Sequence, residues 1–250
     1  MESGGQGFVR LRGALLAAVL TVLLLAPVRA DGARPTPGGP RTIEFSGYTW
    51  TVKSSTRKIG PGPNVFSDSP ANVWVDEDGR LHLKITRSKS RWSCAEVINT
   101  VSLGRGTYTW ELDSPVNALD PSVVLGLFTW NDDPAYNHRE LDWEAARWGS
   151  ASDPTNGQYV VQPWDGPGNL QRMTLTGATP STQSFTWGES SVTFTSSNAD
   201  LGQWTYSGLD VPQPGGENAR MNLWLFRGLA PSDGREVEVV ISTFSFEPLP

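Results

Sequence analysis

Cysteine is almost absent from this chain of 250 residues, because Cys94 is the single one. A lone thiol has no partner within the chain, so no intramolecular disulfide can stabilise the fold. Stability must come instead from the burial of apolar side chains, for which the chain is long enough. No histidine lies near Cys94 in the sequence to activate its thiol, so we interpret it as a small buried residue rather than a nucleophile.

Long apolar runs are also missing, because no stretch approaches eighteen consecutive apolar residues. The longest run, Ala14 to Pro27, follows Arg10 and Arg12 and ends on Val28-Arg29-Ala30, which is the pattern of a cleavable secretory signal. We therefore predict a signal peptide at residues 1–30, a flexible Pro/Gly-rich segment at 31–43 and one domain at 44–250. The protein is expected to be secreted, extracellular and without a membrane-spanning segment.

Basic residues are fewer than acidic ones, with 20 lysines and arginines against 26 aspartates and glutamates. Removal of residues 1–30 takes away three arginines and one glutamate, which leaves 17 against 25 and a net charge of about −8. A protein of this net charge has no overall attraction for polyanions, so we expect neither nucleic acid nor an anionic membrane as a partner. A neutral partner, such as a polysaccharide, fits better, and we expect a monomer.

Helical periodicity is absent from the body of the chain, where short β-branched and aromatic runs alternate with Gly, Pro, Asn, Asp and Ser. The clearest hairpin is predicted at Asn72 to Thr86, because Asp78-Gly79 supplies the positive-φ turn. The pattern predicts an all-β fold, a two-sheet antiparallel β-sandwich of the jelly-roll type. Further strands are expected at residues 96–101, 106–112, 123–130, 140–145, 158–162, 183–187, 192–195, 221–226 and 236–246.

One predicted strand carries three acids at alternating positions, Glu140, Asp142 and Glu144, with Leu141 and Trp143 between them. In a strand the three acids share one face. The Cα atoms of Glu140 and Glu144 then lie roughly 13 Å apart, and their carboxyl groups can approach to about 5 to 6 Å, as in retaining glycosidases. Mutual repulsion must raise at least one pKa, and we expect Glu144 to titrate above Glu140.

The competing interpretation is an acidic stripe on a solvated strand. Arg235-Glu236-Val237-Glu238-Val239 has that ordinary amphipathic pattern. Three acids alternating with apolar residues should occur by chance in only about one chain in a hundred of this length. The triple therefore favours a catalytic group of carboxylates.

The motif ELDWE resembles the unbulged E-x-D-x-E signature of glycoside hydrolase family 16, the jelly-roll clan of lichenases, laminarinases and xyloglucan transglycosylases. The similarity extends to SCAEVINTVSLGRGTYTWEL, VLGLFTW, QYVVQPW and MNLWL, in the family's order, over roughly residues 72–246. The resemblance implies a concanavalin A-like sandwich and retaining hydrolysis of β-linked glycans. It also implies roles for the acids: Glu140 as nucleophile, Glu144 as general acid and base, and Asp142 as the residue that tunes both.

The resemblance further implies a set of glycan-binding positions in a cleft. Tryptophan rings offer flat faces for sugar stacking, and amides bind hydroxyl groups. This sequence departs from the family at His138, where relatives often carry an aromatic residue, and at Ile98, where they often carry an arginine. By strand parity His138 shares the face of the carboxylates, as a sugar ligand or a modulator of their pKa values. The candidate binding residues are Glu96, Trp130, His138, Gln162, Trp164, Asn222 and Trp224.

The sequence thus predicts a secreted endo-acting glycoside hydrolase for a neutral β-linked polysaccharide. Two alternatives stay open, a transglycosylase on the same glycans and a non-catalytic glycan-binding module. No cofactor and no catalytic metal are predicted, because no His or Asp cluster has metal-ligand spacing. The resemblance allows a structural calcium ion, which the sequence cannot reveal.

Overall fold

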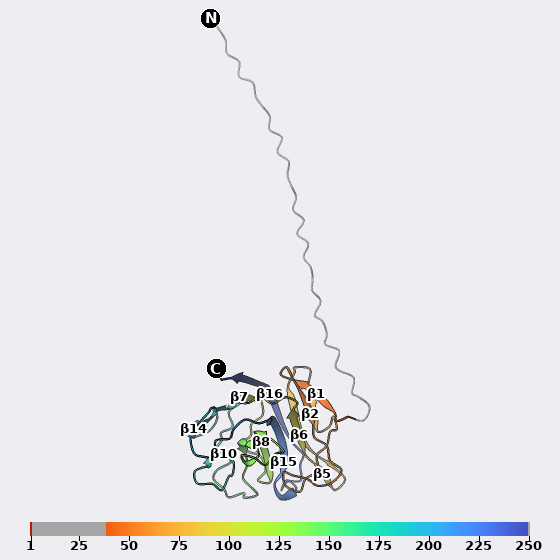
Figure 1. The fold of residues 1–250 in the computed structure, drawn as a ribbon. Coiled ribbons are helices and arrows are strands. Elements are labelled where there is room, and N and C mark those ends of the chain that lie inside the picture. Colours follow the sequence, from red (N-terminus) through yellow and green to blue (C-terminus); the bar gives the residue numbers. More distant parts are fainter. Residues whose placement is uncertain (2–38, 250) are drawn as a thin grey trace. The chain divides into compact units, whose positions relative to one another are not determined.

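The computed structural model describes residues 1 and 39–249 (Figure 1). The predicted signal peptide at 1–30, Met1 apart, and the segment 31–38 lie outside the described residues. The first strand, β1, begins at Thr42, so regular structure starts two residues before the boundary that we placed at residue 44. Arg41 precedes it, and its guanidinium donates hydrogen bonds to the carbonyl oxygens of Asp68 and Val73.

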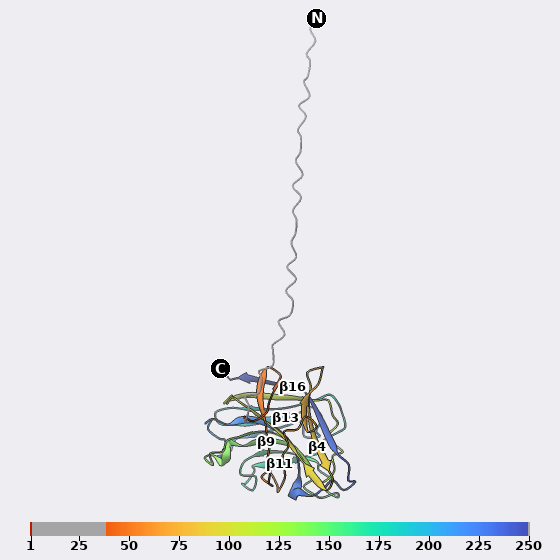
Figure 2. The same cartoon turned by 90° about the vertical axis from the view of Figure 1, so that its right-hand side faces the viewer.

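Residues 39–249 form two antiparallel sheets, which confirms the predicted all-β sandwich (Figures 1 and 2). The first sheet has the order β1 (Thr42–Phe45), β2 (Tyr48–Val52), β6 (Ala95–Asn99), β15 (Asn218–Leu225), β8 (Val123–Trp130), β9 (Leu141–Ala145), β10 (Gly157–Val161) and β11 (Leu170–Met173). The second has the order β14 (Gln203–Tyr206), β13 (Val192–Ser196), β12 (Ser181–Trp187), β7 (Gly106–Leu112), β16 (Val237–Pro248), β4 (Leu81–Ser88) and β3 (Val73–Val75), with β5 (Arg91–Ser93) paired to β4.

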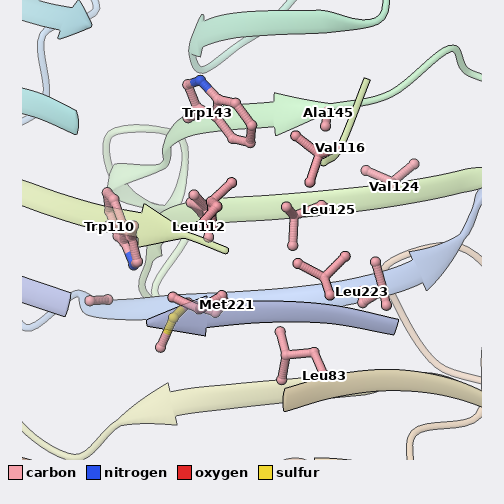
Figure 3. Packing of buried hydrophobic residues seen from close by; sticks show 14 of the residues in the cluster. Leu83, Trp110, Leu112, Val116, Val124, Leu125, Trp143, Ala145, Met221 and Leu223 are labelled. Carbon is pink, nitrogen blue, oxygen red and sulfur yellow. The ribbon is translucent and has the colours of Figure 1, made fainter. Parts of the chain in front are cut away.

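Both sheets direct every second side chain of their strands into a common core, and strands β8 and β10 of the first sheet are buried on their other face as well. In β12 burial alternates along the whole strand, as period-two geometry requires when one face meets the other sheet. Four tryptophans, Trp50, Trp110, Trp143 and Trp187, are fully buried, so these rings pack the core and do not line a binding surface. Side chains from both sheets fill this layer together (Figure 3).

The predicted hairpin is confirmed as β3 and β4. Gly79 has a φ of +79° and supplies the left-handed turn residue, while Asp76 and Arg80 close the loop through a backbone hydrogen bond of 3.0 Å. The side chain of Asp76 accepts further hydrogen bonds from the backbone N–H groups of Asp78 and Arg80. The turn is therefore fixed by one glycine and one carboxylate.

The structure adds five strands that the sequence patterns did not predict, β1, β2, β5, β11 and β14. They have three to five residues each. In such short strands the alternation of apolar and polar residues is too brief to stand out, and pairing with a longer neighbour defines them. Within the described residues the only helices are the two 3₁₀ turns η1 (Asn137–Arg139) and η2 (Phe226–Gly228), and neither has the length or apolar character to cross a membrane.

Candidate active site

Strand β9 lies between β8 and β10 and carries the acids. Leu141 and Trp143 are fully buried in the core, so Asp142 and Glu144 point to the opposite face of the sheet, as the alternation predicts. Asp142 is 4% exposed, and Glu144 is half-buried. Glu140 precedes the strand, but its carbonyl oxygen accepts a 3.2 Å hydrogen bond from the N–H of Gln162, which continues the pairing with the segment after β10.

The turn that enters β9 has an unusual backbone. Four consecutive residues, Tyr136, Asn137, His138 and Arg139, have φ values between 50° and 63°, in the left-handed region that non-glycine residues rarely occupy. The buried guanidinium of Arg139 holds this turn through hydrogen bonds to the carbonyl oxygens of Gln213 and Ala135. Strained backbone of this kind persists where the surroundings enforce it, and here it sets the position of Glu140.

Two glutamines on the neighbouring chain segment hold the acids. Gln158 is directly opposite Glu144 in the register of β10 and β9, and its Nε2 donates to Glu144 Oε2 over 2.6 Å. Gln162 donates to Asp142 Oδ2 over 3.1 Å. The side-chain oxygen of Gln158, Oε1, accepts hydrogen bonds from Trp148 Nε1 and Arg172 Nη1, each at 3.1 Å. Its side-chain amide can therefore present only the NH₂ group to Glu144.

The acids have raised pKa values. Burial, and then the charge of Glu144, raise the pKa of Glu140 to about 8, against a lowering hydrogen bond with Asp142. Burial raises the pKa of Glu144 to about 7, against the lowering effects of Gln158 and Arg172. The pKa of Asp142 is raised well above its ordinary range, by burial and by the charges of both glutamates. The raised pKa favours the protonated form of Asp142, which donates a hydrogen bond to Glu140.

The order of the two glutamates differs from our expectation that Glu144 titrates above Glu140. In the structure the pKa of Glu140 is about 8 and that of Glu144 about 7. The reason is tertiary, because the Gln158 amide and the Arg172 charge stabilise the ionised form of Glu144, whereas Glu96 adds a further raising charge at Glu140. In the unliganded site, Glu140 and Asp142 therefore bind their protons more tightly than Glu144 does.

A cavity of about 500 Å³ opens on one side of the acids, and Asp142 and Glu144 line it. Glu96 lies there with 1% exposure, paired with Lys53 Nζ at 2.7 Å and Arg220 Nη1 at 3.6 Å. We call this cavity the first arm of the cleft. The predicted binding residues that line it are Glu96, Trp130, Asn222 and Trp224.

The lining of this arm requires glycine at position 126. Asn222 is opposite both Glu96 and Gly126 in the sheet register, and a Cβ on Gly126 would come within 2.6 Å of Asn222 Oδ1. Gly126 therefore leaves the space that the Asn222 side chain occupies. Asn222 Oδ1 has no hydrogen-bond partner within the described residues, which leaves a buried acceptor for a bound molecule.

The arginine that is missing at position 98 has a counterpart on the next strand. Arg220 is the direct partner of Ile98 in the pairing of β15 with β6, and both residues line the cavity. Its guanidinium carbon lies 5.9 Å from the Trp130 ring centroid, and its Nε is buried without a partner among the described residues. The first arm therefore contains a guanidinium group after all, supplied by Arg220 on β15 instead of by residue 98 on β6.

A second cavity of about 630 Å³ opens on the other side, where the predicted residues Gln162, Trp164 and Trp224 lie. Trp164 is 63% exposed, so one large apolar ring faces solvent at its rim. Both cavities share Glu144 and Trp224 in their linings. They are therefore two arms of one cleft that meet at Glu144, with Asp142 in the lining of the first arm and Glu140 in neither lining.

His138 lies elsewhere than strand parity predicts. Because it belongs to the left-handed turn and not to the strand, its ring stacks on Trp130, with centroids 4.1 Å apart and planes at 7°. Its Nδ1 lies 2.9 Å from the carbonyl oxygen of Asn131, so that nitrogen carries the proton and donates. His138 therefore supports the Trp130 ring of the first arm.

Sequence reasoning missed several cleft residues, among them five that bear on the acids or the first arm: Lys53, Trp148, Gln158, Arg172 and Arg220. Gln158 had a usable signal, because it has the same parity as Gln162 in a predicted strand. The other four carry no local pattern. Strand pairing and loop packing alone bring them to the acids.

Cys94 is 1% exposed, which confirms it as a small buried residue. Burial raises the pKa of its thiol to about 12, so the reactive thiolate is disfavoured. Within residues 39–249, no group of three or more His, Cys, Asp or Glu side chains is arranged to hold a metal ion.

Comparisons with known proteins found relatives through structure alone. No protein-family model matches the chain, and no curated protein matches its sequence. A beta-glucanase of Bacillus licheniformis superposes with a TM-score of 0.61 at 18% identity, over 84% of this chain and 99% of the other. A non-specific endo-beta-1,3(4)-glucanase from family GH16 gives a TM-score of 0.60 at 14% identity, over 79% and 83%.

A third similar structure is an immunostimulatory antigen and pseudo beta-1,3-glucanase of Mycobacterium tuberculosis. It gives a TM-score of 0.59 at 23% identity, over 77% of this chain and 88% of the other. At such identities the likeness establishes the fold. The resemblance that the motifs indicated is confirmed as a shared β-sandwich, and the chemistry must be argued from the residues of the cleft.

Proposed function

We propose that the chain is a secreted glycoside hydrolase that cleaves internal bonds of a neutral β-linked polysaccharide. The observation that carries this proposal is the position of Glu144 where the two arms of the cleft meet, together with the coupling of its charge to Glu140. A cleft that extends to both sides of the reacting groups accepts an internal segment of a chain. The β-glucanase names of the similar structures support β-glucans as the first substrates to test.

The proposed reaction is a double displacement. The reactive form has Glu140 ionised and Glu144 protonated, which is the minor form of the unliganded site because Glu140 has the higher pKa. In that form the carboxylate of Glu140 attacks the anomeric carbon and forms a glycosyl-enzyme, while Glu144 gives its proton to the leaving oxygen. Glu144 then takes a proton from water, whose oxygen attacks the anomeric carbon and releases Glu140. Asp142 keeps its proton throughout and donates a hydrogen bond to Glu140, which stabilises its ionised form before attack and after release.

The cleft residues have separate tasks in this proposal. Trp130, Trp164 and Trp224 offer flat apolar faces to sugar rings on the two sides of the acids. Glu96, Gln162 and Asn222 offer hydrogen bonds to hydroxyl groups, and Arg220 adds a donor beside Trp130. His138 acts through Trp130, whose ring it stacks on. No cofactor takes part in the proposed reaction.

A non-catalytic glycan-binding protein is the second candidate, because one structure with the same fold is described as a pseudo beta-1,3-glucanase. The experiment is incubation with mixed-linkage β-glucan, laminarin, galactan and xyloglucan, followed by product sizing. Falling chain length supports the hydrolase, and products longer than the substrate support a transglycosylase. Glu140→Gln and Glu144→Gln should each abolish turnover, while Glu111→Gln, an exposed glutamate on β7, should not. Binding of a glycan without any turnover by the wild type supports the second candidate.

A further inference from the structure

A second groove, separate from the cleft, has a volume of about 440 Å³. Residues from the loop 56–65, from the turn between β4 and β5, and from the end of β15 form its walls. We call it the basic groove, because Arg57, Lys58 and Arg91 line it together with Trp92. Of the described residues in its lining, none is acidic.

Two further basic residues lie close to the groove but outside its lining. Arg87 and Lys89, on the same β4–β5 hairpin, are exposed, as are Arg57, Lys58 and Arg91. Within residues 39–249, none of these five side chains forms a salt bridge, although thirteen such pairs occur elsewhere. Five unpaired cations in one place are unexpected on a chain of net charge −6, because the excess of carboxylates offers many partners.

One contact joins the two basic segments of the groove, and two others lie within the β4–β5 hairpin. Arg91 Nη2 donates to the carbonyl oxygen of Thr56 over 3.3 Å, and Arg87 Nε donates to the carbonyl oxygen of Lys89 over 2.9 Å. The guanidinium carbon of Arg87 lies 5.6 Å from the Trp92 ring centroid. These contacts hold the cations near one aromatic ring. One carboxylate, Glu236, lies beside the hairpin, where it accepts a 2.8 Å hydrogen bond from the backbone N–H of Arg87 and pairs with Lys84.

We propose that the basic groove binds an anionic polysaccharide that carries carboxylate or sulfate groups. Guanidinium and ammonium groups recognise both anions, and an indole face provides stacking for the sugar ring between them. A concave site takes a polymer strand, whereas a flat membrane surface would be reached by protruding side chains. The groove and the cleft thus recognise polysaccharides of different charge.

The loop 56–65 is common to both sites. Ile59, Gly60 and Pro61 line the cleft, whereas Pro63 and Asn64 line the basic groove. Asn64 also donates to the carbonyl oxygen of Leu225, the residue after Trp224 of the cleft. An anionic polysaccharide in the groove therefore holds the protein with its cleft close to the same glycan material, although the binding itself does not depend on the proposed hydrolysis.

The test is affinity electrophoresis of the full chain in gels that contain polygalacturonate, dextran sulfate or neutral dextran. We expect retardation by one or both anionic polymers, none by neutral dextran, and loss of retardation in 1 M NaCl, where the Debye length is about 3 Å. The double variant Arg57→Gln/Arg91→Gln should bind roughly tenfold more weakly. Arg235→Gln, which removes an exposed cation outside the groove, is the matched control.

Several outcomes would overturn the proposal. One is equal retardation of the double variant and the wild type, and another is equal weakening by Arg235→Gln. Binding to anionic phosphatidylglycerol vesicles or to single-stranded DNA, but to neither anionic polysaccharide, would assign the groove to another polyanion. Trp92→Ala provides a second test, because a purely electrostatic surface would be unaffected by it. Turnover of neutral glycans in the cleft should not change in Arg57→Gln/Arg91→Gln, so failure of this proposal is distinct from failure of the proposed hydrolase.

Discussion

Gln158 donates a 2.6 Å hydrogen bond to Glu144, and its own carbonyl oxygen is occupied by Trp148 and Arg172. Because the amide favours the ionised carboxylate, Gln158 lowers the pKa of the residue proposed as the general acid. Gln158 is therefore a positioning residue that also sets the protonation state of Glu144.

Replacement of Gln158 by methionine should move the pH profile of kcat/KM to higher pH. A hydrogen bond to a charged group contributes about 1.5 to 3 kcal/mol, so its loss raises the pKa of Glu144 and shifts the profile by about one to two pH units. Initial rates from pH 5 to 10 measure this shift. Gln203→Met, at an exposed position on β14, is the control and should leave the profile in place. An unmoved profile in Gln158→Met would separate Gln158 from the titration of Glu144.

Glu140→Ala and Glu144→Ala should respond differently to azide. In Glu140→Ala, azide takes the place of the nucleophile and yields an α-glycosyl azide from a β-linked substrate with a good leaving group. In Glu144→Ala the glycosyl-enzyme still forms, and azide attacks it to give the β-glycosyl azide. Loss of general acid catalysis alone should lower the rate on natural glycans by about 10² to 10⁴-fold. Product NMR identifies the anomers, and exchanged products would reverse the two assigned roles.

The first sugar released by the wild type should have the β-configuration at its new reducing end. Two successive inversions at the anomeric carbon restore the original configuration, as the double displacement requires. Proton NMR within the first minutes, before mutarotation, reads the anomeric signal directly. Initial appearance of the α-anomer would show a single displacement by water and would remove the nucleophilic role of Glu140.

Glu140→Gln should stabilise the protein at alkaline pH. The pKa of Glu140 is raised in the folded state from 4.5 to about 8, so the folded form binds the proton more tightly than the unfolded form. Its contribution to stability is therefore complete below about pH 4.5 and is lost as pH rises through about 8. At pH 9 the variant should be more stable than wild type by up to about 5 kcal/mol and should unfold at a higher temperature, with little difference at pH 4.

Thermal unfolding of wild type, Glu140→Gln and the control Glu111→Gln at both pH values tests this expectation. Glu111 is exposed on the other sheet, so its replacement should change neither curve. Equal melting temperatures of wild type and Glu140→Gln at pH 9 would show that burial does not raise the pKa of Glu140.

Arg220 should act mainly in binding. Arg220→Ile removes the guanidinium beside Trp130, and we expect KM to rise roughly tenfold, the cost of about one charged hydrogen bond, with a smaller change in kcat. The double variant Ile98→Arg/Arg220→Ile puts the guanidinium on the partner position of the adjacent strand and should recover part of the loss. No recovery would show that the side chain must come from β15.

The sequence by itself determined the fold class and the strand that carries the acids. Alternation with period two is a local property, so the residue order alone assigns Glu140, Asp142 and Glu144 to one face, with Leu141 and Trp143 opposite. The hairpin at Gly79 was equally local, since one turn residue and two flanking runs specify it. Short strands such as β5 and β14 were missed because they lack enough residues for alternation to show.

The tertiary structure alone decided which side chains surround the acids. Gln158 and Arg172 reach Glu144 through strand pairing and reverse the order of the two glutamate pKa values that we expected. Pairing of β15 with β6 sets Arg220 opposite Ile98. Packing of the loop 56–65 against the β4–β5 hairpin brings their lysines and arginines together on a chain of net negative charge. Contacts between residues far apart in the chain depend on register and packing, which composition and local periodicity do not encode.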